Sequence, residues 1–101
     1  LAQDPQVFLL DEPIQQLEPQ HQLAVLAQLR GLAAAGRTVV MSLHDAGLAA
    51  RYANECWLLF GDGRWSCGPT EEVLDEASIG RLYGIAVKEL RWNEGRTFVP
   101  A

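Results

Sequence analysis

Basic residues, cysteine and long apolar runs are scarce in this 101-residue chain, and each scarcity excludes a class of protein. Lys and Arg number 8 against 13 Asp and Glu, a formal net charge of -5 without any basic block, which argues against nucleic acid as the main partner. No apolar stretch approaches the roughly 20 residues that a membrane-spanning helix needs. The two cysteines, Cys56 and Cys67, lack metal-type spacing, so we interpret them as buried, reduced thiols of a cytosolic protein, with a bond between them left open.

The start of the chain is unusual. It begins at Leu1 rather than Met, and the residues before Asp4-Pro5 are typical of the end of a helix. No basic and apolar leader precedes them. We therefore expect that processing or fragmentation removed a preceding segment, and that the chain is one small soluble domain or part of a larger one.

The most informative segment is the run VFLLDEP at residues 7–13. Four consecutive apolar residues favour a strand that is covered on both faces, as in a parallel sheet flanked by helices. Ligand sites in such sheets lie at the carboxyl ends of the strands. Pro13 lacks a backbone N–H and ends the ladder, so Asp11 and Glu12 are expected at that edge.

The remaining pattern predicts an α/β unit with a small C-terminal appendage. A helix over about 19–35, begun by Pro19 and ended by Gly36, leads to a second buried strand at 38–43. The Asp-Gly turn at 61–64 predicts a hairpin, which would form an antiparallel margin on the parallel sheet. Further elements are expected at 45–53 (helix), 56–60 and 65–67 (strands), from Thr70 as N-cap (helix), 79–83 (short helix ended by Gly84), and 85–92 with 96–99 (terminal hairpin).

The adjacent carboxylates of Asp11 and Glu12 are suited to phosphoryl transfer to water. One acid can support a hydrated Mg²⁺ ion, and the other can orient or deprotonate the attacking water. Because side chains alternate along a strand, the pair must lie where the backbone leaves it. An ordinary acidic exit from a strand into a turn remains an equally open interpretation.

His44 follows the second predicted strand, level with the two carboxylates if the strands run parallel. An imidazole there could touch a phosphate or the attacking water. The alternative is a solvent-exposed histidine at a strand end, beside the helix start at Asp45. His21 lies within the first predicted helix and is interpreted as a solvated surface residue.

Several segments, in their order and spacing, resemble the C-terminal part of the ATPase subunit of ATP-binding cassette (ABC) transporters. The match covers essentially the whole chain. VFLLDEP at 7–13 resembles the Walker B motif, VVMSLHD at 39–45 the switch-histidine segment, and residues 61–64 and 68–74 the hairpin and helix that follow it. The resemblance implies a partial P-loop NTPase (RecA-like) domain over residues 1–101, with parallel strands, crossover helices and antiparallel hairpins at the C-terminal end.

The resemblance also implies roles for individual residues. Asp11 would bind Mg-ATP by supporting Mg²⁺ through water, Glu12 would be the general base, and His44 would contact the γ-phosphate. Leu17 and Glu18 fall where the family's D-loop reads Leu-Asp. This sequence departs from that pattern at Glu18 and at the glutamines that replace the small residue before Leu17. The departures put in question the coupling between two ATPase subunits, and not the hydrolytic chemistry.

Three motifs of the family are absent from the sequence. These are the Walker A phosphate loop G-x-x-x-x-G-K-[ST], the Q-loop and the Leu-Ser-Gly-Gly-type signature, all of which precede the Walker B motif in the family. Without the amides and lysine of the phosphate loop, ATP loses its main electrostatic anchor. We therefore expect that these 101 residues alone bind ATP negligibly and hydrolyse none.

Within the family, LYGI at 82–85 and GRTFV at 95–99 resemble the importer subunits that serve vitamin B12, iron–siderophore or haem uptake, with vitamin B12 as first choice. The resemblance then implies a homodimer of ATPase subunits, transmembrane permease subunits as partners, and a cytoplasmic position on the inner face of the plasma membrane. The transported substrate stays open, because specificity in such importers rests with the permease and binding protein.

Two other functions remain to be weighed. A non-catalytic ABC-like binding or regulatory module would be indicated by a native start near Leu1. A non-transport ABC ATPase acting on DNA or the ribosome is disfavoured by the acidic balance and by the absence of a basic patch. Isolated from a first half, the sheet is expected to expose an edge or core surface and to associate.

Overall fold

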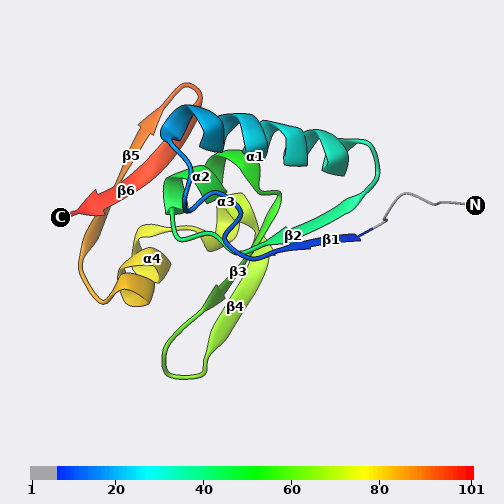
Figure 1. Ribbon diagram of the computed structural model, residues 1–101. Coiled ribbons are helices and arrows are strands. Elements are labelled where there is room, and N and C mark those ends of the chain that lie inside the picture. The colour runs from blue at the N-terminus through cyan, green and yellow to red at the C-terminus, as the bar shows by residue number, and fades with distance from the viewer. Residues whose placement is uncertain (1–6) are drawn as a thin grey trace, which may run out of the picture. The chain divides into compact units, whose positions relative to one another are not determined.

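The structure is a computed structural model that describes residues 7–101, in two compact units that divide between His44 and Asp45. The helix end predicted before Asp4-Pro5 lies outside the described residues. The first unit contains β1 (Val7–Leu10), α1 (Pro19–Ala34) and β2 (Thr38–Met41) (Figure 1). The second contains α2 (Ala46–Tyr52), β3 (Glu55–Leu59), β4 (Trp65–Pro69), α3 (Thr70–Val73), α4 (Glu76–Tyr83), β5 (Val87–Trp92) and β6 (Gly95–Pro100).

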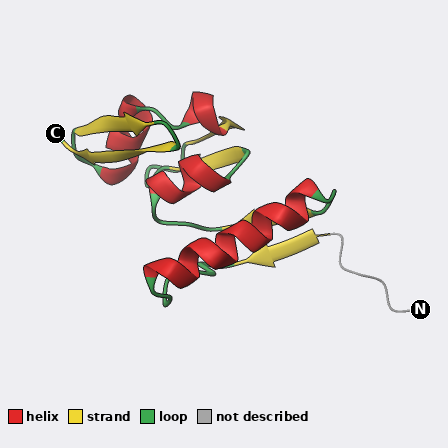
Figure 2. Ribbon diagram, turned by 90° about the horizontal axis from the view of Figure 1, so that it is seen from above, coloured by secondary structure: helices red, strands yellow, loops and turns green. Residues whose placement is uncertain are grey.

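The first unit is a strand, a helix and a second strand that is parallel to the first. Val7 pairs with Thr38 and Leu10 with Met41, so both strands end at the same edge. Helix α1 runs alongside the strand pair and packs on β2 (Figure 2), with Leu26 fully buried. The predicted parallel pair with its crossover helix is confirmed.

Local sequence signals explain the limits of α1. Pro19 occupies the first turn, where a missing N–H costs no helical hydrogen bond. Gly36 adopts a φ of 95°, and its N–H donates to the Ala33 carbonyl at 3.1 Å while the Arg37 N–H donates to the Leu32 carbonyl at 3.1 Å. These two bonds form a Schellman motif, which satisfies carbonyls at the helix end and needs glycine at the left-handed position.

The prediction that the first strand is covered on both faces is wrong for the described residues. Leu9 is 75% exposed, and Val7 on the same strand is also exposed. Val40 on the neighbouring strand β2 is exposed as well. Exposed and half-buried residues alternate along β1 and β2, because α1 is the one described helix of this unit and covers a single face of the pair. A continuous apolar run therefore did not establish two-sided burial here.

The second unit is built on two antiparallel hairpins, β3–β4 and β5–β6. Each forms its own two-stranded sheet, so the expected antiparallel margin on the parallel sheet is wrong for the described strands. The turn at residues 61–64 gives β3 an immediate neighbour in the chain, and closing so short a loop costs little entropy. Gly63 has a φ of 85°, and the Arg64 N–H donates to the Asp62 carboxylate at 3.0 Å.

The core of the second unit consists of buried residues from β3, the turn after it, the end of α3 and helix α4. Its members are Leu58, Phe60, Leu74 and Ile79. Alanines of α2 and Phe98 of β6 pack against this cluster. The hairpin β5–β6 is therefore more than an ornament, since one of its faces helps to close the core.

Helix caps in this unit agree only partly with the predictions. Asp45 caps α2 by accepting from the Leu48 N–H at 3.0 Å, and Gly84 ends α4 with a φ of 74°. The predicted N-cap role of Thr70 is wrong. Its hydroxyl instead donates to the Ala53 carbonyl at 2.8 Å, because the residue is buried beside that carbonyl and α3 begins one residue earlier than expected.

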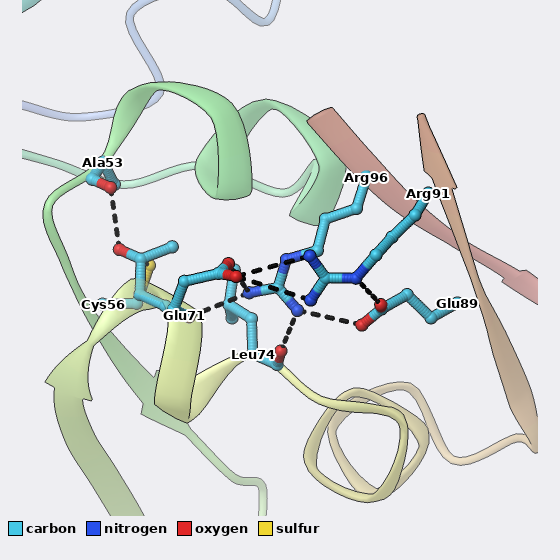
Figure 3. Close-up of polar contacts among 8 residues, drawn as sticks. Ala53, Cys56, Glu71, Leu74, Glu89, Arg91 and Arg96 are labelled. Atoms are coloured by element: carbon cyan, nitrogen blue, oxygen red, sulfur yellow. Dashed lines mark hydrogen bonds and ion pairs between the residues drawn. The ribbon is translucent and has the colours of Figure 1, made fainter. Parts of the chain in front are cut away.

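A buried arginine joins the terminal hairpin to α3 (Figure 3). The Arg96 side chain is 4% exposed and donates to the carbonyls of Thr70, at 3.0 Å, and Leu74. It also pairs with Glu89 at 3.0 Å and Glu71 at 3.2 Å. A buried charge needs such partners, since removal of water without them is costly.

The cysteines are both free. Cys56 is half-buried, and its sulfur lies 3.4 Å from the Thr70 hydroxyl. Cys67 is exposed, so the expectation of two buried thiols is wrong for this residue, because it faces outward on β4. Among the described residues, no helix is both long and apolar enough to cross a membrane.

Candidate active site

Polar side chains gather where the two parallel strands of the first unit end. Because Leu10 pairs with Met41, Asp11 stands level with Ser42 on the neighbouring strand. The Ser42 N–H donates to the Leu10 carbonyl at 3.1 Å and so continues the ladder by one step beyond β2. The predicted site for chemistry, at the carboxyl ends of the strands, is therefore formed by the segments that follow β1 and β2.

The backbone leaves β1 at Glu12 in an uncommon conformation. Glu12 has a φ of 48°, in the left-handed region that a side chain with a Cβ rarely adopts, and Pro13 follows directly. Its N–H donates to the Ser42 hydroxyl at 2.8 Å, and its carbonyl accepts from the Gln15 N–H at 3.4 Å. Strain of this kind persists where the surroundings fix it and is concentrated at functional sites.

The Ser42 hydroxyl links the two acidic residues. It donates to Oδ1 of Asp11 at 2.7 Å and accepts from the Glu12 amide, so its proton and one of its lone pairs are both used. The Asp11 and Ser42 side chains are exposed. The carboxylate of Asp11 therefore lies fixed at an edge that a ligand can reach.

His44 completes the cluster. Its Nε2 contacts Oε1 of Glu12 in a hydrogen bond that becomes an ion pair when the imidazole is protonated. The His44 side chain is 76% exposed and that of Glu12 is partly covered. An exposed imidazole against a carboxylate can orient that carboxylate and exchange protons with a bound water.

The structure thus brings together three of the residues that the sequence singled out, Asp11, Glu12 and His44. It places Leu17 and Glu18 elsewhere, in the turn that leads to α1. Glu18 occupies the N-cap position without a side-chain cap, and its carbonyl accepts from two N–H groups of the first helical turn, both at 2.9 Å. Their assignment to a D-loop stays a prediction.

Ser42 is the residue that sequence reasoning missed. It lies in the segment that resembles the switch-histidine motif, where the resemblance implies a role for His44. A signal was present, because the parallel register places a hydroxyl one residue beyond β2, level with the carboxylates that follow β1. His21, by contrast, is exposed on α1 as expected.

The oxygen donors at this edge could supply one ligand to a Mg²⁺ ion. Within residues 7–101, no group of three His, Cys, Asp or Glu side chains is placed to hold a metal. Asp11 offers a single exposed carboxylate. Mg²⁺ retains several waters and is commonly held by one or two carboxylates plus substrate phosphates, so Asp11 fits an ion whose other ligands come from elsewhere.

Comparison with known proteins finds ATP-binding proteins of transport systems among the relatives. The chain is 41% identical to the achromobactin transport ATP-binding protein CbrD of Dickeya dadantii over 86 residues, which cover 84% of this chain and 32% of CbrD. It is 38% identical to the vitamin B12 import ATP-binding protein BtuD of Salmonella heidelberg over 85 residues, 84% of this chain and 34% of BtuD. No protein-family model matches the chain.

The hemin import ATP-binding protein HmuV of Roseobacter denitrificans is 37% identical over 84 residues, 83% of this chain and 32% of HmuV. A solved metal-chelate type ABC transporter in an inward-facing conformation matches the fold with a TM-score of 0.83 and 26% identity, over 95% of this chain and 40% of that one. The chain is a homologue of ABC transporter ATP-binding subunits. It spans about a third of the curated relatives that it matches.

The ABC relationship confirms the family resemblance read from the sequence. It also confirms the fold class, because the α/β arrangement with one parallel strand pair and C-terminal hairpins superimposes on an ABC transporter structure. The three relatives named above, CbrD, HmuV and BtuD, are ATP-binding proteins of import or transport systems.

Proposed function

We propose that the chain is the C-terminal part of the ATP-hydrolysing subunit of an ABC importer. One observation carries the proposal, the hydrogen-bonded cluster of Asp11, Glu12, Ser42 and His44 at the common end of two parallel strands. The names of the relatives support the family, and the cluster supports a hydrolytic role for this edge. Walker B, D-loop and switch-histidine segments would lie in these residues, and the phosphate loop in a preceding part.

In this proposal Glu12 is the general base. Its carboxylate accepts a proton from the attacking water, whose oxygen forms a bond to the γ-phosphorus while the bond to the bridging oxygen breaks and ADP leaves. His44 holds the Glu12 carboxylate by direct contact and is exposed on its other side, where a γ-phosphate can approach. Preorganised charges of this kind cost no rearrangement during the reaction.

Asp11 would hold Mg²⁺ through the water molecules of the ion. The bound ion would supply charge neutralisation for the phosphates. Asp11 itself is kept in place by the Ser42 hydroxyl, so its carboxylate is presented in a fixed direction. Leu17 and Glu18 would meet a second copy of the subunit, as a D-loop in a homodimer.

We propose transmembrane permease subunits as further partners and the cytoplasmic face of the membrane as the location. The cargo class rests on the named relatives, which serve achromobactin transport, hemin import and vitamin B12 import at 37–41% identity. The identities of this chain to the three relatives are nearly equal, so they favour none of the three cargoes over the others. Uptake of vitamin B12, haem or an iron–siderophore is therefore proposed as a class.

The test compares the native polypeptide with the isolated 101 residues. The mass and N-terminal sequence of the native protein should reveal a longer chain with a phosphate loop, and that protein should hydrolyse Mg-ATP. The isolated chain should release no phosphate. A native start at Leu1 would leave a non-catalytic module, and Mg²⁺-dependent turnover by the isolated chain would show that a phosphate loop is not needed.

A further inference from the structure

The Ser42 hydroxyl makes one hydrogen bond to each of the two adjacent acidic residues. Its hydroxyl donates to Asp11 at 2.7 Å and accepts from the Glu12 N–H at 2.8 Å. Donation to a carboxylate fixes the direction of the hydroxyl proton, which leaves a lone pair aimed at the amide. The two bonds therefore support one another.

The support of the hydroxyl is rigid. Ser42 keeps its own backbone in the ladder through the bond of its N–H to the Leu10 carbonyl at 3.1 Å. The oxygen that holds Asp11 and Glu12 is thus attached to a strand end rather than to a free loop. Groups held by fixed elements keep a productive geometry better than groups held by loops.

Glu12 is the residue that most needs such support. Its backbone lies in the left-handed region at a φ of 48°, which is unfavourable for a residue with a Cβ. Without the hydroxyl, the Glu12 N–H would lose its partner, and Pro13 offers no N–H of its own to hold the turn. The backbone could then rotate and carry the Glu12 carboxylate away from His44.

From these contacts we propose that Ser42 is a positioning residue for hydrolysis, which holds both Asp11 and Glu12 in register through one hydroxyl. This rests on the proposed function. Ser42 takes no proton from substrate and acts only through the Asp11 carboxylate and the Glu12 backbone amide. Its loss should therefore lower kcat for ATP by a larger factor than it raises the KM for ATP, because the strained Glu12 backbone depends on the hydroxyl while Asp11 keeps its exposed carboxylate.

The test measures steady-state phosphate release by the intact subunit with Ser42→Ala, Ser42→Thr and, as a control, Ser66→Ala on β4. Loss of a supporting hydrogen bond of this kind commonly costs about 10- to 100-fold in activity. We expect a kcat loss in that range for Ser42→Ala, with recovery in Ser42→Thr, because Ser42 is exposed and the added methyl has room. Ser66→Ala should keep the wild-type kcat.

A second measurement needs no turnover. Amide exchange in the intact subunit, followed by NMR, should accelerate at Glu12 in Ser42→Ala and stay slow in Ser42→Thr, while the ladder amide of residue 42 keeps its protection. Equal exchange at Glu12 in all variants, or an active subunit with undiminished kcat in Ser42→Ala, overturns the positioning role alone. A wild-type subunit without ATPase activity overturns the proposed function, and the positioning role with it.

Discussion

Glu12 is held at both ends, its amide by the Ser42 hydroxyl and its carboxylate by the His44 imidazole. The sequence placed the carboxylates and His44 at one edge, because strand ends can be located from an apolar run and a following proline. It did not reveal the left-handed backbone of Glu12 or the bridging role of Ser42. Those depend on the register between strands that are separated by a helix.

We expect His44→Ala to impair hydrolysis by the intact subunit. Loss of the imidazole removes the contact that orients the Glu12 carboxylate, so we expect turnover by the intact subunit to fall by about 10²-fold or more, the range for a group engaged in proton transfer. His21→Ala on the exposed surface of α1 is the matched control and should keep wild-type turnover. Wild-type kinetics for His44→Ala would return His44 to the role of an ordinary surface histidine.

Elements that depend on local chemistry were predicted well. Gly36 and Gly84 end their helices, and the Asp-Gly turn makes the β3–β4 hairpin, because each needs only a positive φ or a neighbouring N–H. The N-cap prediction for Thr70 is wrong because its hydroxyl donates to the carbonyl of Ala53, which is distant in sequence. Arg96 carried no sequence signal at all, since its partners come from α3, β5 and the segment after α3.

Two helical glycines, Gly80 and Gly31, differ in the space around them. A Cβ at Gly80 of α4 would lie 2.9 Å from the Ile85 carbonyl oxygen, a backbone atom that cannot turn aside, whereas nothing lies within 4 Å of a Cβ at Gly31 of α1. We expect Gly80→Ala to lower the free energy of unfolding by about 1–3 kcal/mol. Gly31→Ala should raise it by up to about 1 kcal/mol through helix propensity.

Urea unfolding followed by circular dichroism would measure both changes. The pair is matched, because each variant adds one methyl group to a helix and removes the same backbone freedom. Equal stabilisation by the two substitutions would contradict the close approach of α4 to the Ile85 carbonyl.

The ion pairs of the terminal hairpin predict a pH dependence. The hydrogen bond from Arg91, with a further one from Arg96, holds the pKa of Glu89 below its usual range, although burial opposes this. A carboxyl whose pKa is lower in the folded state contributes stability above its unfolded value, about 4.3 for glutamate, and loses it as the pH falls through the folded pKa. The second unit should therefore weaken below about pH 4.3.

Tryptophan fluorescence would follow this loss, since all 3 tryptophans, Trp57, Trp65 and Trp92, belong to the second unit. Glu89→Gln should flatten the fall in urea midpoint between neutral and acidic pH. Glu94→Gln, in the turn between β5 and β6, is the control and should keep the wild-type slope. The same change of urea midpoint with pH in Glu89→Gln and the wild type would show that the Glu89–Arg91 pair does not stabilise the fold.

Both units expose large apolar side chains. Val7, Leu9 and Val40 are exposed in the first unit, and Trp57 and Trp65 stack at 6.2 Å on an exposed face of the second. Contiguous apolar patches of this kind mark interaction surfaces or association. The chain matches about a third of its relatives, so other parts of such a subunit are proposed to cover these faces.

The isolated chain should therefore associate as its concentration rises, and light scattering would detect it. Leu9→Lys places a charge on the exposed face of β1 and should lower the apparent mass without unfolding the chain, because Leu9 is 75% exposed. A clean monomer at every concentration tested would show that the exposed faces do not drive association.

If this chain carries the hydrolytic edge of an ABC ATPase, as proposed, Glu12→Gln should abolish the chemistry of the intact subunit. The measurement is phosphate release from Mg-ATP by the intact subunit, with nucleotide binding measured beside it and Glu94→Gln as control. The amide keeps the shape of the side chain but cannot accept the proton, so ATP binding should persist while hydrolysis is nearly abolished. Wild-type turnover in Glu12→Gln would show that the general base lies elsewhere and that this edge is not the hydrolytic one.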